Sequence, residues 1–143
     1  MVQAPRKEKV IGIPEYIIRD PYGTLHCAGC HESIAQRLIG DTLEEMELTG
    51  KAIGIAGCGC ASGFFLALDF DSAQTAHGRP PDVATGIKRF RPNSLVFTVQ
   101  GDGDAIAIGT EPLIQAAARS EKITVVMLNN ANYGMTGGQM APT

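Results

Sequence analysis

The feature that most constrains the fold is a pair of continuous apolar, β-branched segments with a helical segment between them. Residues 94–100 read SLVFTVQ and residues 122–128 read KITVVML. Such runs are typical of strands that are buried on both faces of a parallel sheet. A helix is expected between them, ending near Arg119, because residues 113–118 supply an apolar face. The pattern predicts an α/β fold with a parallel sheet and helices on both faces.

The first half of the chain shows the same alternation less clearly. Residues 51–56 predict another buried strand, followed by a Gly-Cys-Gly-Cys turn at residues 57–60. Residues 64–70 are apolar and aromatic, and so short a run fits either a strand or a helix.

Two further helices are predicted from capping residues. One is expected to begin at Ser33 and to end near Gly40. The other is expected to begin at Asp82 and to end near Arg89, after a loop at residues 77–81.

Composition limits the classes of partner. The chain has 143 residues, 44% of them apolar, which suits one domain or a piece of one. The net charge of −3 lacks the basic footprint of a nucleic-acid binder, so no nucleic-acid partner is expected. No run approaches the ~20 apolar residues of a membrane helix, and no secretory signal is seen. We therefore expect a cytoplasmic protein without a membrane partner.

The chain divides into two parts. Residues 1–25 contain three prolines and are expected to form an N-terminal arm, and residues 26–143 the folded domain. Residues 129–143 are glycine-rich loop material, and nothing after them could cover that end of the sheet. We therefore expect an N-terminal fragment whose fold is incomplete at the C-terminus, with a flexible tail on a complete domain as the alternative.

A Gly-Asp-Gly turn at residues 101–103 directly follows the predicted strand 94–100. Ligands of open α/β sheets bind beyond the carboxyl ends of strands, where a following helix offers free N–H groups to phosphate. Asp102 is expected to bind Mg²⁺, since that ion prefers oxygen ligands shared with phosphate. Asn130 follows the next strand and is expected to join it, with the Asn132 carbonyl as a third ligand.

This two-part pattern resembles the thiamine diphosphate motif, in which Gly-Asp-Gly is followed by about 25 residues and then Asn-Asn. Gly101, Gly103 and Asp104 are then expected to cradle the diphosphate.

The resemblance extends along residues 26–143 and is to the β (thiamine diphosphate-binding) subunit of 2-oxoacid:ferredoxin oxidoreductases. The closing residues 138–143 are most similar to the 2-oxoisovalerate branch of that family. The matching stretches are Cys27-x-x-Cys30, Gly57-x-Gly59-Cys60, His77-Gly78-Arg79, residues 84–88, 101–104 and 133–139.

The resemblance implies a thiamine diphosphate-binding fold and a subunit that helps to convert a 2-oxo acid to acyl-CoA and CO₂. It implies electron transfer to ferredoxin, coenzyme A as acyl acceptor, and α and other subunits of one complex. The glutamate that activates the cofactor is expected from a partner chain, so this chain alone should be inactive. Cofactor contacts are expected from Gly59, Cys60, His77, Arg79, Tyr133 and Thr136.

The cysteines have three interpretations. By resemblance, Cys27, Cys30 and Cys60 match three ligands of a [4Fe–4S] cluster, with a fourth expected beyond residue 143. The sequence departs from the family at Ala28, where proline is usual, and at His31-Glu32, where Gly-His is usual. The alternatives are a structural zinc site of all four cysteines, including Cys58, and unliganded thiols.

Two other function classes are left open: a non-catalytic α/β module with that zinc site, and a non-redox thiamine diphosphate decarboxylase or carboligase. Three cofactor contacts also have a plainer interpretation. His77 and Arg79 fit an ordinary surface loop without a catalytic role, and the Thr136 hydroxyl fits a turn-stabilising role.

Overall fold

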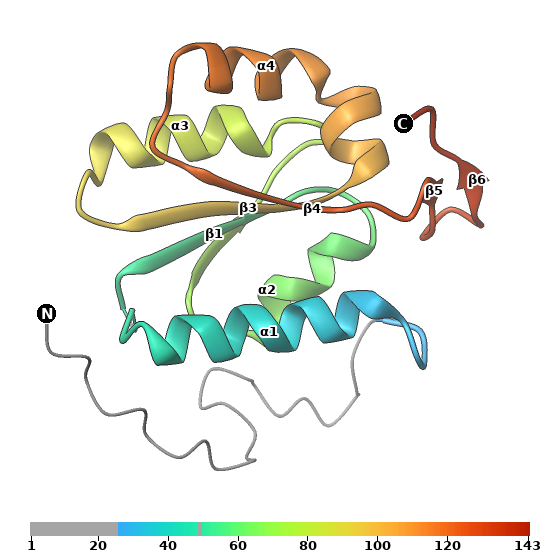
Figure 1. Ribbon diagram of the computed structural model, residues 1–143, viewed down its shortest axis with the longest axis horizontal. Coiled ribbons are helices and arrows are strands. Elements are labelled where there is room, and N and C mark those ends of the chain that lie inside the picture. The colour runs from blue at the N-terminus through green and yellow to red at the C-terminus, as the bar shows by residue number, and fades with distance from the viewer. Residues whose placement is uncertain (1–25, 49) are drawn as a thin grey trace, which may run out of the picture.

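The computed structural model describes residues 26–48 and 50–143, so the predicted N-terminal arm lies outside the described residues (Figure 1). Its main sheet has four strands, all parallel, in the order β2-β1-β3-β4. The strands are β1 (Ala52–Ala56), β2 (Asp71–Gln74), β3 (Leu95–Gly101) and β4 (Thr124–Leu128).

Helices cover both faces of this sheet (Figure 1). On one face lie α1 (His31–Glu45) and the short α2 (Phe64–Ala67), and on the other lie α3 (Pro80–Phe90) and α4 (Thr110–Ala118). The predicted parallel α/β fold is therefore confirmed. Among the described residues, none of the helices has the length and apolar character needed to cross a membrane.

The core consists of two apolar clusters, one on each face of the sheet. Phe97 of β3 packs with Leu43 of α1 and Phe64 of α2. Its neighbour Val96 points to the opposite face and packs with Ala84 of α3. Successive side chains of a strand alternate between faces, so one apolar strand supplies both clusters.

The order of the strands creates a crevice between β1 and β3. From β1 the chain passes through α2 to the neighbouring strand β2, and from β3 it passes through α4 to β4 on the other side. Because the two connections leave toward opposite faces, the carboxyl ends of β1 and β3 form a topological switch point, where ligands of such sheets bind.

Both predicted helix caps are wrong. Helix α1 begins at His31 with Cys30 as its N-cap residue, because Cys30 has an extended backbone, and Ser33 lies inside the helix. Helix α3 begins at Pro80, and Asp82 lies in its first turn. Proline has the backbone angle of a helix start and needs no N–H partner there.

The ambiguous segment 64–70 begins as helix α2, and the strand β2 that follows was not predicted. Its sequence, Asp-Ser-Ala-Gln, is mostly exposed at the edge of the sheet and lacks an apolar pattern. The predicted loop at 129–143 contains a small antiparallel pair, β5 (Asn132–Tyr133) and β6 (Gln139–Met140).

Candidate functional site

A recess of about 450 Å³, partly open to solvent, lies at the carboxyl edge of the sheet. The segments that follow β1, β2, β3 and β4 all contribute to its wall, together with the start of α1. The lining residues are Glu32, Cys58, Gly59, Cys60, Ala61, His77, Gly101, Gly103, Asp104, Asn130, Asn132, Tyr133, Gly134, Met135 and Thr136.

The register of the sheet brings the two halves of the Gly-Asp-Gly and Asn-Asn motif to one edge. Gly101 of β3 lies opposite Leu128 of β4, so the residues after the two strands begin at the same level. The Asn130 main-chain N–H donates to Asp102 Oδ1 over 3.4 Å. The Asp102 carboxylate is fully buried, and its Oδ2 accepts a hydrogen bond from the Thr143 hydroxyl.

Asn130 and Asn132 form a tight polar turn beside this carboxylate. Asn130 Oδ1 accepts the Asn132 main-chain N–H over 3.1 Å, and Asn132 Nδ2 donates to the Asn130 carbonyl over 3.3 Å. Both residues line the recess, whereas Asp102 is not among its lining residues. The structure thus joins Asp102 to the Asn130 turn through a main-chain N–H, and a shared Mg²⁺ remains a prediction.

Glycines give the recess its room. A Cβ atom added at Gly59 or at Gly101 would meet nothing within 4 Å, so both main chains border open space. At Gly103 a Cβ atom would lie 2.4 Å from Cε1 of Tyr133, so this glycine permits close packing of the aromatic ring. The main chain can therefore approach a bound anion at Gly59 and Gly101.

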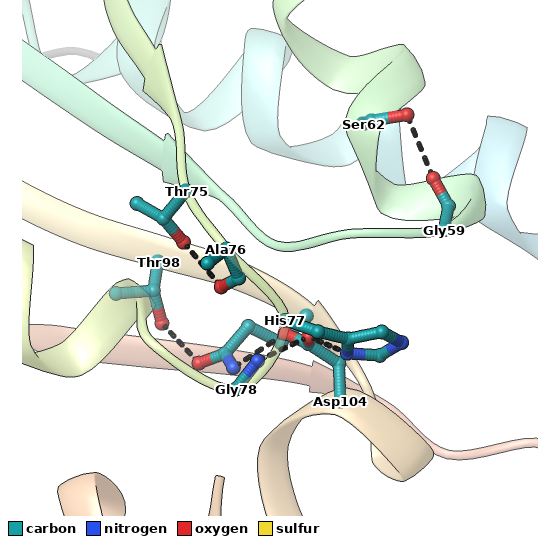
Figure 2. A network of polar contacts seen from close by, with 9 residues as sticks. Gly59, Ser62, Thr75, Ala76, His77, Gly78, Thr98 and Asp104 are labelled. Atoms are coloured by element: carbon teal, nitrogen blue, oxygen red, sulfur yellow. Dashed lines mark hydrogen bonds and ion pairs between the residues drawn. The ribbon is translucent and has the colours of Figure 1, made fainter. Parts of the chain in front are cut away.

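Asp104 lines the recess, and its carboxylate organises the loop after β2 (Figure 2). Its carboxylate, 2% exposed, accepts the Gly78 main-chain N–H over 2.7 Å and Gln100 Nε2–H over 2.6 Å. His77 Nδ1 also bonds to it. Asp104 lies in the first turn of the π-helix η2 (Gly103–Ile108), a form often found at functional sites.

His77 and Arg79, adjacent in sequence to Gly78, point to different places. The His77 ring lines the recess and lies edge to face with the ring of Tyr133, at 6.4 Å between centroids. The Arg79 guanidinium pairs with Asp82 at 3.3 Å and with Glu111 at 3.2 Å, and Arg79 is not among the lining residues. The structure thus places His77 at the recess and Arg79 on a neighbouring helix surface.

Thr136 lines the recess but is already engaged within its own turn. Its hydroxyl donates to Gln139 Oε1 over 2.7 Å. This contact supports the turn-stabilising interpretation of that residue.

Glu32 is a buried acid in the wall that sequence reasoning missed. Burial raises the pKa of this carboxyl, and burial also lowers the pKa of His26, whose Nδ1 lies 3.3 Å from Glu32 Oε2. Both shifts favour the neutral forms. The only sequence signal was the departure from the family's Gly-His at residues 31–32.

The cysteines lie near one another but do not form a metal centre within the described ranges, 26–48 and 50–143. All four are free thiols, and no group of three or more His, Cys, Asp or Glu side chains there has a coordinating arrangement. Burial raises the pKa of the Cys60 thiol, and the nearby charges of Glu32, Cys30 and Cys27 raise it further.

Three other lining residues were not named as site residues: Ala61, in the turn after β1, and Gly134 and Met135, inside the 133–139 motif. Cys58, also in the turn after β1, was named only for the alternative zinc site. Gly134 borders Cys60, because a Cβ atom there would lie 3.4 Å from the Cys60 Sγ. The sequence signal for these residues was their position beside predicted site residues in the same motifs.

Two subunits of 2-oxo acid-converting enzymes are similar to this chain in sequence. The chain is 46% identical over 123 residues to the ketoisovalerate oxidoreductase subunit VorA of Methanothermobacter thermautotrophicus, covering 86% of this chain and 26% of the relative. It is 39% identical over 129 residues to the 2-oxoglutarate synthase subunit KorB of Archaeoglobus fulgidus, covering 90% of this chain and 48% of the relative. The chain thus spans between a quarter and a half of the length of these relatives.

A solved structure has the same fold. It is a 2-oxoglutarate:ferredoxin oxidoreductase from Magnetococcus marinus with 2-oxoglutarate, coenzyme A and succinyl-CoA bound. The TM-score is 0.85 at 32% identity, with all of this chain and 49% of that chain covered. The sequence profile of the C-terminal TPP-binding domain of thiamine pyrophosphate enzymes matches residues 28–143. With the glycine turn and the asparagine pair meeting at the switch point of a matching sheet, the chain belongs to the family of thiamine pyrophosphate enzyme C-terminal domains.

Proposed function

We propose that this chain is the thiamine diphosphate-binding part of a 2-oxoacid:ferredoxin oxidoreductase. The reaction is oxidative decarboxylation of a 2-oxo acid to acyl-CoA and CO₂, with electrons passed to ferredoxin. The observation that carries the proposal is the meeting of Asp102 and Asn130 at the carboxyl edge of the sheet. The names of the relatives supply the reaction class.

A branched-chain 2-oxo acid, 2-oxoisovalerate, is the proposed substrate. The identity of 46% to a ketoisovalerate oxidoreductase subunit, against 39% to a 2-oxoglutarate synthase subunit, supports this choice. Closing residues 138–143 point to the same branch.

The residues at the recess fit thiamine diphosphate with Mg²⁺. Asp102 is a fully buried carboxylate, which needs compensation by donors or a cation. The turn that contains Asn130 and Asn132 is hydrogen-bonded to it through the Asn130 main-chain N–H, and the open space at Gly101 admits a diphosphate. When bound, thiamine diphosphate supplies the carbon nucleophile and the electron sink for decarboxylation.

Several partners follow from this proposal. The activating glutamate is proposed to come from an α subunit, so the chain alone is expected to bind cofactor without turning over substrate. Ferredoxin and coenzyme A are the proposed electron and acyl acceptors, and the proposed location is the cytoplasm.

The cysteines supply three thiols of the set that a [4Fe–4S] cluster needs, and four is the usual complement. Cys27 and Cys30 lie close enough to raise the pKa of the Cys60 thiol, but the three are not arranged as ligands within the described residues. The cluster therefore stays a prediction. Iron, sulfide and zinc analysis after anaerobic purification tests it: one zinc per chain without iron would favour the structural-zinc module.

The direct test is coenzyme A-dependent reduction of a low-potential dye by the protein assembled with its partner subunits. We expect reduction with 2-oxoisovalerate and a lower kcat/KM with 2-oxoglutarate. Product formation without any electron acceptor would instead support a thiamine diphosphate decarboxylase or carboligase.

A further inference from the structure

Two buried positions of β3, on the face that packs under α3, hold polar side chains where apolar ones are usual. Val96 packs under α3, and the next two residues on the same face are Thr98 and Gln100. Both are fully buried. Burying polar groups costs free energy unless their hydrogen bonds are satisfied, so their presence needs an explanation.

Their hydrogen bonds run in one direction toward the recess (Figure 2). The Thr98 hydroxyl donates to Gln100 Oε1 over 3.2 Å. Gln100 Nε2–H then donates to Asp104 Oδ2 over 2.6 Å. Asp104 Oδ1 receives the Gly78 main-chain N–H and His77 Nδ1. The chain of contacts thus ends on an imidazole that is one-third exposed at the recess.

The roles of the ring nitrogens follow from this arrangement. Asp104 already accepts the Gly78 N–H on Oδ1 and the Gln100 Nε2–H on Oδ2, so we assign the hydrogen of its contact with His77 to Nδ1. The second ring nitrogen, Nε2, points away from Asp104 (Figure 2). In the imidazolium form Nε2 also carries a hydrogen and can donate, while the carboxylate fixes the orientation of the ring.

The surroundings leave the carboxylate little freedom. A Cβ atom at Gly57 would lie 2.1 Å from Asp104 Oδ2, so the main chain of the turn after β1 packs directly against it. On the other side, a Cβ atom at Gly78 would lie 2.9 Å from the main chain of Gly109. The absence of both side chains lets the His77 loop close against η2.

We propose that Thr98, Gln100 and Asp104 are positioning residues that hold the His77 imidazolium so that its Nε2–H donates to an anionic oxygen of the ligand in the recess. This inference rests on the proposed function, which offers two such oxygens: the diphosphate of the cofactor and the carboxylate of the 2-oxo acid. Replacing buried partners with apolar groups of similar shape is often nearly neutral for stability, so stability alone does not explain why this face is polar.

Variants of His77 separate the two ring nitrogens. His77→Asn keeps a donor near the place of Nδ1 and removes Nε2, whereas His77→Gln retains a donor near the place of Nε2. We expect His77→Asn to weaken ligand binding about tenfold, as loss of a charge-assisted hydrogen bond does. We expect His77→Gln to bind the ligand with most of the wild-type affinity. His31→Asn, on the exposed start of α1, is the matched control.

Two titrations identify the oxygen. One measures Mg²⁺–thiamine diphosphate binding to the assembled protein, and the other measures 2-oxoisovalerate binding to the cofactor-loaded protein. A loss confined to the first assigns His77 to the diphosphate, and a loss confined to the second assigns it to the substrate carboxylate. Unchanged affinity in both titrations overturns the proposal.

Gln100→Leu tests the positioning itself. The chain contains three histidines, so the ring nitrogens of His77 are identifiable by NMR after ¹⁵N-histidine labelling, with His77→Asn giving the assignment. In the ligand-bound wild-type protein we expect both ring nitrogens of His77 to carry a hydrogen. In Gln100→Leu we expect the His77 signals to move and the affinity to fall several-fold. Lower stability with unmoved His77 signals and unchanged affinity would show a purely structural role and overturn the proposal.

The outcomes also separate this inference from the function on which it rests. A wild-type protein that binds neither ligand contradicts the proposed function. If the wild-type protein binds both ligands and His77→Asn binds them equally tightly, only the role of His77 is contradicted.

Discussion

Asp102 Oδ1 lies 3.4 Å from the main-chain nitrogen of Asn130, although the whole of η2, α4 and β4 separates these residues in the chain. The contact follows from the register in which Gly101 faces Leu128. Two parallel strands that end level with one another bring an acid and an amide to the same corner of the recess. The site therefore depends on the pairing of β3 with β4 as much as on the residues that line it.

Gly103→Ala should damage both stability and cofactor binding. The added Cβ would lie 2.4 Å from the Tyr133 ring, so the ring or the turn must move. We expect a loss of about 1–3 kcal/mol in the free energy of unfolding, as for overpacked sites, measured by urea denaturation.

Gly86→Ala is the matched control for that change. Gly86 lies inside α3, and nothing stands within 4 Å of an added Cβ. Alanine favours a helix by up to ~1 kcal/mol over glycine, so this variant should be more stable than wild type. Equal effects of the two substitutions would show that the Tyr133 contact does not limit the site.

Phe64→Ala should be among the more destabilising single changes. The side chain is 2% exposed and packs with Leu43 and Phe97 beneath the sheet. Truncation of such a ring typically costs about 3–5 kcal/mol. Phe90→Ala, at a ring that is 82% exposed at the end of α3, should change the free energy of unfolding by less than ~0.5 kcal/mol. Similar thermal midpoints for the two variants would contradict the assignment of the core.

The ion pair between Arg89 and Glu121 should make stability depend on pH. The hydrogen bond from Arg89 holds the pKa of the Glu121 carboxyl below its ordinary value. A depressed pKa stabilises the fold above the pKa of the unfolded chain, and that contribution is lost as the pH falls through the folded value. Glu121→Gln should remove this part of the pH dependence.

The effect at Glu121 should be small and sensitive to salt, because Arg89 is exposed. Unfolding curves at several pH values, with and without 1 M NaCl, measure it. Glu44→Gln on the exposed side of α1 serves as the comparison. A Glu121→Gln profile that runs parallel to that of wild type throughout the acid range would show that the pair does not stabilise the fold.

The fold class was predictable from the sequence because β1, β3 and β4 are short, continuous apolar runs, a pattern that is typical of strands in a parallel sheet. Sequence reasoning missed β2, since an exposed edge strand needs no apolar pattern. It also misplaced the starts of α1 and α3. Backbone conformation at Cys30 and the proline pair at residues 80–81 decided those boundaries, and the capping side chains did not.

The site was predictable where residues were part of contiguous motifs. The family was identified correctly, and the main-chain N–H of Asn130, a predicted ligand, does meet the Asp102 carboxylate. The recess also gathers His77 and Tyr133. The role of a single side chain depends on its direction in space, and that is why the pairing of Arg79 with exposed acids was not foreseen.

Calorimetry of thiamine diphosphate binding in the presence and absence of Mg²⁺ tests the central claim most directly. Asp102→Asn keeps the size of the buried side chain and removes its charge, and the exposed Asp69→Asn is the control. We predict Mg²⁺-dependent binding to the wild-type protein and to Asp69→Asn, and at least about a tenfold loss in Asp102→Asn, the size of effect expected for a lost charged contact. Folded Asp102→Asn protein that binds the cofactor with wild-type affinity and the same Mg²⁺ dependence would contradict the account.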